Sequence, residues 1–108
     1  MGVGAAAAIV FQQQPDVEVI GKAIDIVIAN IAGILCDGAK GGCALKVVSS
    51  TDCAILAAYQ AIGGLKISSN DGILGQTPEE TIRNLGIVSK LGLSQMDSTV
   101  LDIMVGKM

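Results

Sequence analysis

The chain has to build its core almost without aromatic side chains, because its 108 residues include one Phe, one Tyr and no Trp. Hydrophobic residues still make up 51% of the chain, which is too apolar for a disordered segment. The core must therefore consist of Ala, Ile, Leu and Val, and the 14 glycines allow backbones to approach closely. A chain of this length is one domain at most, so we treat residues 1–108 as a single domain.

The spacing of apolar residues predicts an all-α fold, a compact bundle of about four to five helices. Residues 2–11 lack an N-cap and resemble the later part of a buried helix; a frayed, Ala-rich terminus is the alternative. Pro15 and the carboxylates after it predict the start of a helix that runs to about Cys36. A further helix is predicted over residues 43–62, ended by Gly63-Gly64. Its apolar side is expected to consist of Ala44, Val47, Val48, Ile55, Ala58 and Ile62.

The remaining segments follow the same logic. Residues 65–76 are predicted to be an irregular excursion or a short hairpin. Residues 77–80 (TPEE) form a capping box with Pro at the first helical position, so a helix should follow and stop near Gly92. Ser94 together with Asp97 is expected to cap a last helix.

Residues 36–43 (CDGAKGGC) are the only segment that looks organised for a ligand. They combine a thiol, a carboxylate, an ammonium group and several glycines between two predicted helices. A thiol near a lysine and a helix N-terminus is a candidate to bind a metal or to attack an electrophile. The alternative is a tight turn whose cysteines only pack in the core. The spacing does not match the GxxxxGK[ST] phosphate loop.

The three cysteines cannot all meet at one centre. If residues 43–62 form one helix, Cys43 and Cys53 lie roughly 15 Å apart along its axis and about 80° off a common face. Cys36 and Cys43 could approach each other across the turn. The chain therefore supplies one or two ligands to a metal cluster, whereas an iron–sulfur centre is usually held by three or four cysteines.

Lys46 lies in an otherwise apolar stretch and shares a polar face with Ser49, Ser50 and Cys53 at helical spacing. One interpretation is a solvated face. The other is the wall of an active site in which Lys46 or Lys40 acts as a general base, a role that burial of a lysine promotes.

Charge and composition exclude several functions. The net charge of −3 and the lack of aromatics disfavour a nucleic-acid partner. Histidine is absent, and the three cysteines form no CxxC pair, which argues against a zinc knuckle or a disulfide framework. No positively charged region precedes an apolar stretch, and residues 1–15 are too short to cross a bilayer. We therefore expect a cytoplasmic protein without a membrane partner.

Three stretches of sequence carry a resemblance to a known family: residues 30–46 (NIAGILCDGAKGGCALK), residues 80–86 (ETIRNLG) and residues 101–104 (LDIM). They resemble the C-terminal part of the serine dehydratase alpha-chain-like family, in particular its L-cysteine desulfidase branch. The similarity covers essentially the whole chain. The CDGAK…CALK block is its most specific part.

The resemblance implies an all-α catalytic domain with a [4Fe-4S] cluster held by three cysteines. One iron is left open as a Lewis acid, while a base removes the α-proton of cysteine or serine. β-Elimination of sulfide or water then leads to pyruvate and ammonia. Carried over residue by residue, Cys36 matches a cluster ligand. Cys43 matches the block as a neighbour of the cluster rather than a ligand, and Cys53 matches no ligand.

The residues of the Gly-rich turn and of the polar face after it, rather than the resemblance, make Asp37, Gly38 and Lys46 candidates for the loop around the cluster and substrate, and Lys40 a candidate base. Family members are several times longer and carry their other cluster cysteines upstream. We therefore expect this chain to be the C-terminal portion of a larger domain, without a complete cluster or lyase activity on its own. It would need the missing N-terminal segment or a second subunit.

A second function of a different class fits the composition. Gly- and Ala-rich helices with few aromatics pack closely, so the chain could be a non-catalytic helical module that self-associates or docks onto a partner. A homo-oligomer is expected from this interpretation. An enzyme part and an associating module are compatible for the same chain.

Overall fold

The computed structural model of the protein describes residues 1–36, 38 and 40–108. These residues form five α-helices: α1 (Gly2–Gln13), α2 (Val17–Ile31), α3 (Gly41–Ile62), α4 (Pro78–Ile87) and α5 (Met96–Val105). A π-helical turn, Val88–Gly92, extends α4, and the described residues contain no strand. The predicted all-α bundle is confirmed.

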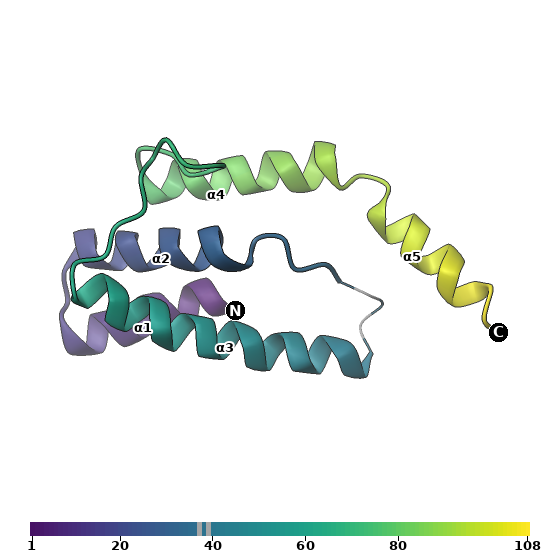
Figure 1. Cartoon of the computed structure of the whole chain (residues 1–108), viewed down its shortest axis with the longest axis horizontal. Helices are drawn as coiled ribbons and strands as arrows, with labels where there is room; N and C mark the ends of the chain where they lie inside the picture. The colour runs from purple at the N-terminus through teal and green to yellow at the C-terminus, as the bar shows by residue number, and fades with distance from the viewer. Residues whose placement is uncertain (37, 39) are drawn as a thin grey trace.

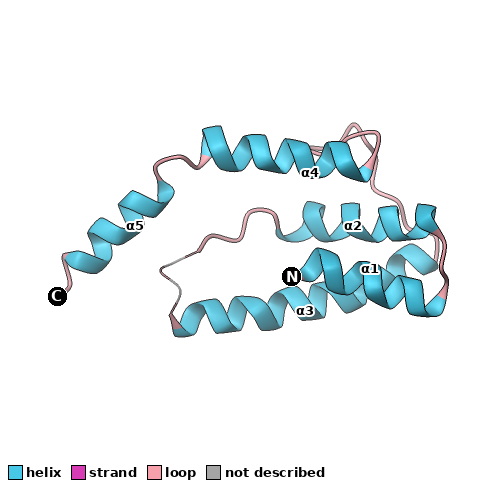
Figure 2. Cartoon of the chain, turned by 180° about the vertical axis from the view of Figure 1, so that it is seen from behind, coloured by secondary structure: helices cyan, strands magenta, loops and turns pink. Residues whose placement is uncertain are grey.

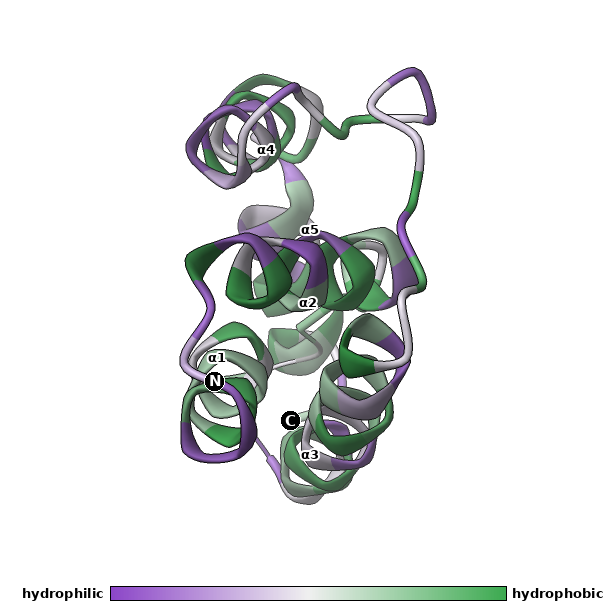
Figure 3. Cartoon of the chain, turned by 90° about the vertical axis from the view of Figure 1, so that its left-hand side faces the viewer, coloured by the Kyte–Doolittle hydropathy of each residue, from purple (hydrophilic) through white to green (hydrophobic). Residues whose placement is uncertain are grey.

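Three helices form the centre of the molecule: α2 runs opposite to α1 and α3, and all three pack pairwise against one another (Figure 1). Helix α4 lies on the outer side of α2, which Figure 3 shows in the view along the bundle. Helix α5 leaves the bundle and gives the molecule its long dimension, with extents of 50 × 27 × 16 Å (Figure 2). The segment that follows α2, residues 32–36, extends toward the end of the molecule where α5 lies.

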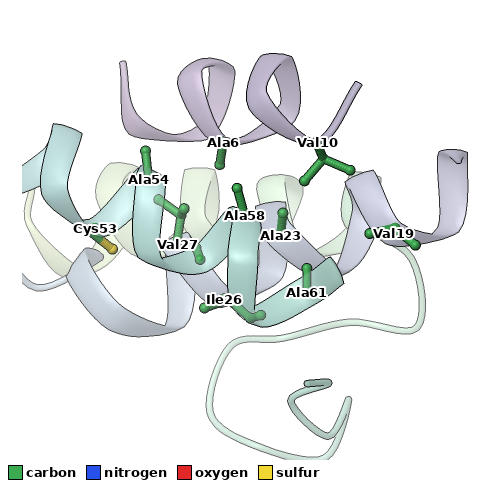
Figure 4. Packing of buried hydrophobic residues seen from close by; sticks show 11 residues of the cluster. Ala6, Val10, Val19, Ala23, Ile26, Val27, Cys53, Ala54, Ala58 and Ala61 are labelled. Atoms are coloured by element: carbon green, nitrogen blue, oxygen red, sulfur yellow. The ribbon is translucent and has the colours of Figure 1, made fainter. Parts of the chain in front are cut away.

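Alanine dominates the core that the three helices share (Figure 4). Small side chains let the helix axes approach, so that most of this core is less than 2% exposed. The fully buried members are Ala6, Val10, Ala23, Val27, Ala54, Ala57, Ala58 and Ala61. Because the core lacks aromatic side chains, close approach of the helix backbones, and not large side chains, excludes water from it.

The buried face of α3 differs from the predicted one. The core contains Cys53, Ala54, Ala57, Ala58 and Ala61. Of the predicted apolar side, Ala58 is buried and Ile62 half-buried, whereas Ala44, Val47, Val48 and Ile55 are exposed. The prediction was wrong there because close packing selects the small residues for the interface and leaves the larger ones outside.

Two helix limits also differ from the prediction. Helix α2 begins at Val17 rather than at Pro15, and Asp16 is its N-cap: the Asp16 side chain accepts a hydrogen bond from the Glu18 N–H at 2.9 Å. The helix ends at Ile31 rather than near Cys36, and Ile34 and Leu35 beyond it are about half exposed (45% and 52%). Because both side chains are about half exposed, apolar burial offsets little of the cost of ordering a longer helix there.

The capping box of α4 is confirmed, with the Thr77 hydroxyl accepting from the Glu80 N–H at 3.2 Å. The Glu80 carboxylate reaches back to the Gln76 N–H at 2.7 Å instead of the Thr77 N–H. At α5 the predicted Ser94 cap is wrong. Gln95 is the N-cap residue and makes no side-chain cap, and the Ser94 hydroxyl points back to the Leu91 carbonyl.

Candidate functional site

Two cysteine thiols meet at the end of the bundle where α3 begins. Cys36 lies on the irregular segment after α2, and Cys43 lies in the first turn of α3. Their Sγ atoms are 3.7 Å apart, within sulfur hydrogen-bonding distance, and either thiol can be the donor. The expected approach of these two cysteines across the turn is confirmed. Cys36 is exposed and Cys43 is partly buried.

Gly38 shapes the segment between the two cysteines. Its φ of +105° lies in the left-handed region that side chains other than glycine rarely adopt. A Cβ at this position would collide with the sulfur atom of Met104 in α5. Gly38 therefore both turns the chain and allows α5 to pack directly on it.

A hollow of about 290 Å³ lies between this segment and α5. It is lined by Cys36, Gly38, Asp97, Val100, Leu101 and Met104. Sequence reasoning missed Asp97 and Met104 as parts of the site, although their seven-residue spacing places them on one face of a helix. No local pattern connects that face to a cysteine 61 residues earlier.

The two candidate lysines lie near the thiols along the chain. Lys40 is exposed and occupies the N-cap position of α3, where its side chain makes no cap. Lys46 is partly buried and follows Cys43 by three residues, so both project from similar sides of α3. The predicted site residue Asp37 lies outside the described residues.

Cys53 does not belong to this site. It is 8% exposed and packs in the core shared by the three helices (Figure 4). Burial raises the pKa of the Cys53 thiol, and a hydrogen bond with Asn30 offsets part of that effect. Helix α3 is continuous from Gly41 to Ile62, so Cys43 and Cys53 are held apart as expected.

The polar face predicted for α3 is not solvated along its length. Ser50 is partly buried, and a Cβ added to Gly2 at the start of α1 would meet its hydroxyl. Cys53 at the far end of that face is buried, whereas Ser49 is exposed. Only the part near Lys46 is close enough to Cys43 to contribute to a site.

The donor set around Cys36 is small. Within residues 1–36, 38 and 40–108, no group of three or more Cys, Asp or Glu side chains gathers where a metal could bind. Cys36 and Cys43 thus offer two sulfur atoms from one side.

Comparison with known proteins gives one family. The sequence profile of the serine dehydratase alpha chain matches residues 1–102. The UPF0597 protein of Geobacter sulfurreducens is 55% identical to 98% of this chain, and that of Elusimicrobium minutum is 53% identical to 98%. The UPF0597 protein of Desulforapulum autotrophicum is 44% identical over 99%.

The alignments cover 25%, 25% and 24% of these relatives, so the chain spans about a quarter of the length of the curated relatives that it matches. No solved structure matches the chain. The chain belongs to the serine dehydratase alpha chain family.

Proposed function

We propose that this chain is the part of an iron–sulfur amino-acid lyase that presents Cys36 as a ligand of a [4Fe-4S] cluster. The observation that carries the proposal is the exposed Cys36 thiol, 3.7 Å from Cys43 at the edge of a hollow, in a chain of the serine dehydratase alpha family. The substrate class is a small α-amino acid with a β-leaving group, cysteine or serine. The products are pyruvate and ammonia.

The residues present are suited to supply one ligand of such a cluster. Cys36 is accessible and lies on a segment that no helix constrains, which suits a ligand that must reach a cofactor. With Cys36 as a thiolate ligand, the S–H of Cys43 becomes the donor of the 3.7 Å contact. Hydrogen bonds to cluster sulfurs tune the potential of an iron–sulfur centre, which gives Cys43 a role without iron binding.

When bound, such a cluster supplies an open iron that acts as a Lewis acid. The chain's own side chains would bind the charged groups of the substrate and remove its α-proton. Asp97 lines the hollow and offers a carboxylate for the α-ammonium group of the substrate. Lys46 offers a positive charge for the substrate carboxylate, and Lys40 is the candidate base for the α-proton. The electron pair left by that proton expels the β-substituent, and the resulting aminoacrylate hydrolyses.

The remaining cluster ligands must be residues other than Cys36 and Cys43. We assign them to a further segment of a longer protein or to a second subunit, since the relatives are about four times as long as the aligned region. The exposed apolar side chains support such a neighbour, because Leu45 in α3 and Leu91 after α4 are each 70% exposed. We expect no turnover of cysteine or serine by the 108 residues alone.

A chimaeric enzyme tests the proposal. This chain would replace the matching quarter of the Geobacter sulfurreducens relative, and the product would be loaded with iron and sulfide without oxygen. Pyruvate release from cysteine and serine is then compared for the chimaera, its Cys36→Ser variant and its Cys53→Ser variant. We expect activity that Cys36→Ser abolishes and Cys53→Ser retains. Equal activity in the Cys36→Ser variant would remove the basis of the proposal.

A second candidate, a non-catalytic module that associates with itself, rests on a different apolar surface. A groove of about 450 Å³ lies between α2, the 67–74 segment and α4, and its lining is almost entirely apolar. Sedimentation of the purified chain over a wide concentration range tests this candidate. Concentration-dependent oligomers favour it, and a monomer throughout contradicts it.

For location we propose the cytoplasm, where three thiols stay reduced. Helix α3 is long and apolar enough to cross a membrane by length and composition. It also packs one face against α1 and α2, and core helices of soluble proteins meet the same criteria. Fractionation of cells that express the tagged protein would test the location.

A further inference from the structure

The contact between Cys36 and Cys43 has a chemical consequence apart from metal binding. Two thiols 3.7 Å apart need only a small movement to form a disulfide, whose S–S bond is about 2.05 Å long. Cys36 lies on an irregular, exposed segment, so side-chain rotation and a small shift of that segment can supply the movement. The third cysteine, Cys53, is buried in the core and out of reach.

We propose that Cys36 and Cys43 are a redox-modification site, at which hydrogen peroxide forms a reversible disulfide within the chain. Redox-sensitive cysteines are typically accessible and poised next to a resolving cysteine, and this pair has both properties. Cys36 is the thiol that meets the oxidant because it is the more exposed of the two. Cys43 is the resolving thiol.

The reaction balances in two steps. The Cys36 thiol attacks one oxygen of hydrogen peroxide, the O–O bond breaks, and a sulfenic acid and one water form. The Cys43 sulfur then attacks the Cys36 sulfur, the S–O bond breaks, and the hydroxyl leaves as a second water with the Cys43 proton. The two thiols lose two electrons and two protons, and the peroxide is reduced to water. A dithiol reverses the reaction by exchange.

The disulfide would regulate the proposed cluster site. A Cys36 sulfur bonded to Cys43 no longer offers a thiolate to iron, so oxidation would block cluster assembly until a reductant restores the thiol. Because the second thiol captures the sulfenic acid, Cys36 is also protected from irreversible oxidation to the sulfinic acid. This consequence rests on the proposed function, whereas the disulfide itself does not.

Trypsin provides a direct test because it cleaves after lysine and separates the three cysteines. Cys36 falls in peptide 23–40, Cys43 in peptide 41–46 and Cys53 in peptide 47–66. The reduced chain is treated with one equivalent of hydrogen peroxide, remaining thiols are alkylated, and the digest is analysed by mass spectrometry without reductant. We expect peptide 23–40 linked to peptide 41–46, with Cys53 alkylated, and loss of the link after dithiothreitol.

Two variants serve as controls, with helicity checked by circular dichroism. Cys53→Ala should give the same linked peptides. Cys43→Ala should leave Cys36 to oxidise to the sulfinic acid under excess peroxide, a product that dithiothreitol does not reverse. Links that involve peptide 47–66, links only between chains, or separate oxidation of Cys36 and Cys43 in the unsubstituted chain would each overturn the proposal.

The regulatory consequence is measured in the chimaera with the Geobacter sulfurreducens relative. Peroxide treatment before anaerobic loading should lower iron uptake, and dithiothreitol should restore it; in the Cys43→Ala variant restoration should fail. Equal restoration in both would contradict a protective role of Cys43. If the reduced chimaera takes up no iron, the proposed function fails while the peptide experiment still decides the disulfide.

Discussion

Replacing Ala54 by Leu tests which face of α3 is buried. Ala54 is 0% exposed and belongs to the cluster shared by α1, α2 and α3, so a larger side chain there would have to displace its neighbours. Ala54→Leu adds three carbon atoms there, and overpacking of this kind costs about 1–3 kcal/mol. With a urea m value of about 1–3 kcal/mol/M, a loss of about 2 kcal/mol lowers the unfolding midpoint by roughly 1 M. Urea unfolding followed by circular dichroism measures this shift.

The same substitution at Ala44 is the matched control. Ala44 lies on the same helix but is exposed, and Leu and Ala have similar helix propensities. The free energy of unfolding of Ala44→Leu should therefore stay within about 0.5 kcal/mol of the unsubstituted chain. If Ala44→Leu were the more destabilising variant, the face predicted from periodicity would be the buried one, and the packing described here would be refuted.

Three further outcomes follow from single contacts. Thr81→Val should lower the free energy of unfolding by about 1–3 kcal/mol in urea titrations. The buried Thr81 hydroxyl accepts a hydrogen bond from the Gly75 N–H at 3.0 Å, and valine leaves that donor unpaired. An unchanged free energy of unfolding would mean that the hydroxyl is not buried. Thr77→Ala should cost about 1 kcal/mol in thermal unfolding by removing the cap of α4, and an unchanged melting temperature would exclude that cap. Burial raises the pKa of the Cys53 thiol above its ordinary value of 9.0. Because the folded chain favours the neutral thiol, Cys53 contributes its full share to the free energy of unfolding below about pH 9, and this share is lost as the pH rises through the raised pKa of the folded state. In urea titrations across this pH range, the free energy of unfolding should fall less with rising pH for Cys53→Ala than for the unsubstituted chain. An equal fall in both chains would contradict the burial of the Cys53 thiol.

Much of the fold is predictable from local signals. The capping box at Thr77 and Glu80 fixes the start of α4, and Gly63-Gly64 marks the end of α3. These signals act within a few residues, so a single sequence contains them in full. The buried face of α3 is not predictable in this way, because its large apolar residues match helical periodicity better than the alanines that pack inside.

The site is predictable in its centre but not in its surroundings. Cys36 and Cys43 are seven residues apart in a Gly-rich stretch that leads into a predicted helix, so the sequence itself indicates that the two thiols can approach. The contribution of α5 depends on the contact between Met104 and Gly38, which are 66 residues apart in the sequence. The residues around Met104 contain no pattern that predicts this contact. Long-range packing of this kind appears only in three dimensions.

The retention of iron by two cysteine variants tests the central claim most directly. In the chimaera with the Geobacter sulfurreducens relative, iron and acid-labile sulfide per chain are measured after anaerobic loading and gel filtration for Cys36→Ser and Cys53→Ser. The account predicts that Cys36→Ser loses the bound iron and sulfide, while Cys53→Ser keeps the amount found without substitution. Full iron content in the Cys36→Ser variant would contradict the assignment of this chain to the cluster site.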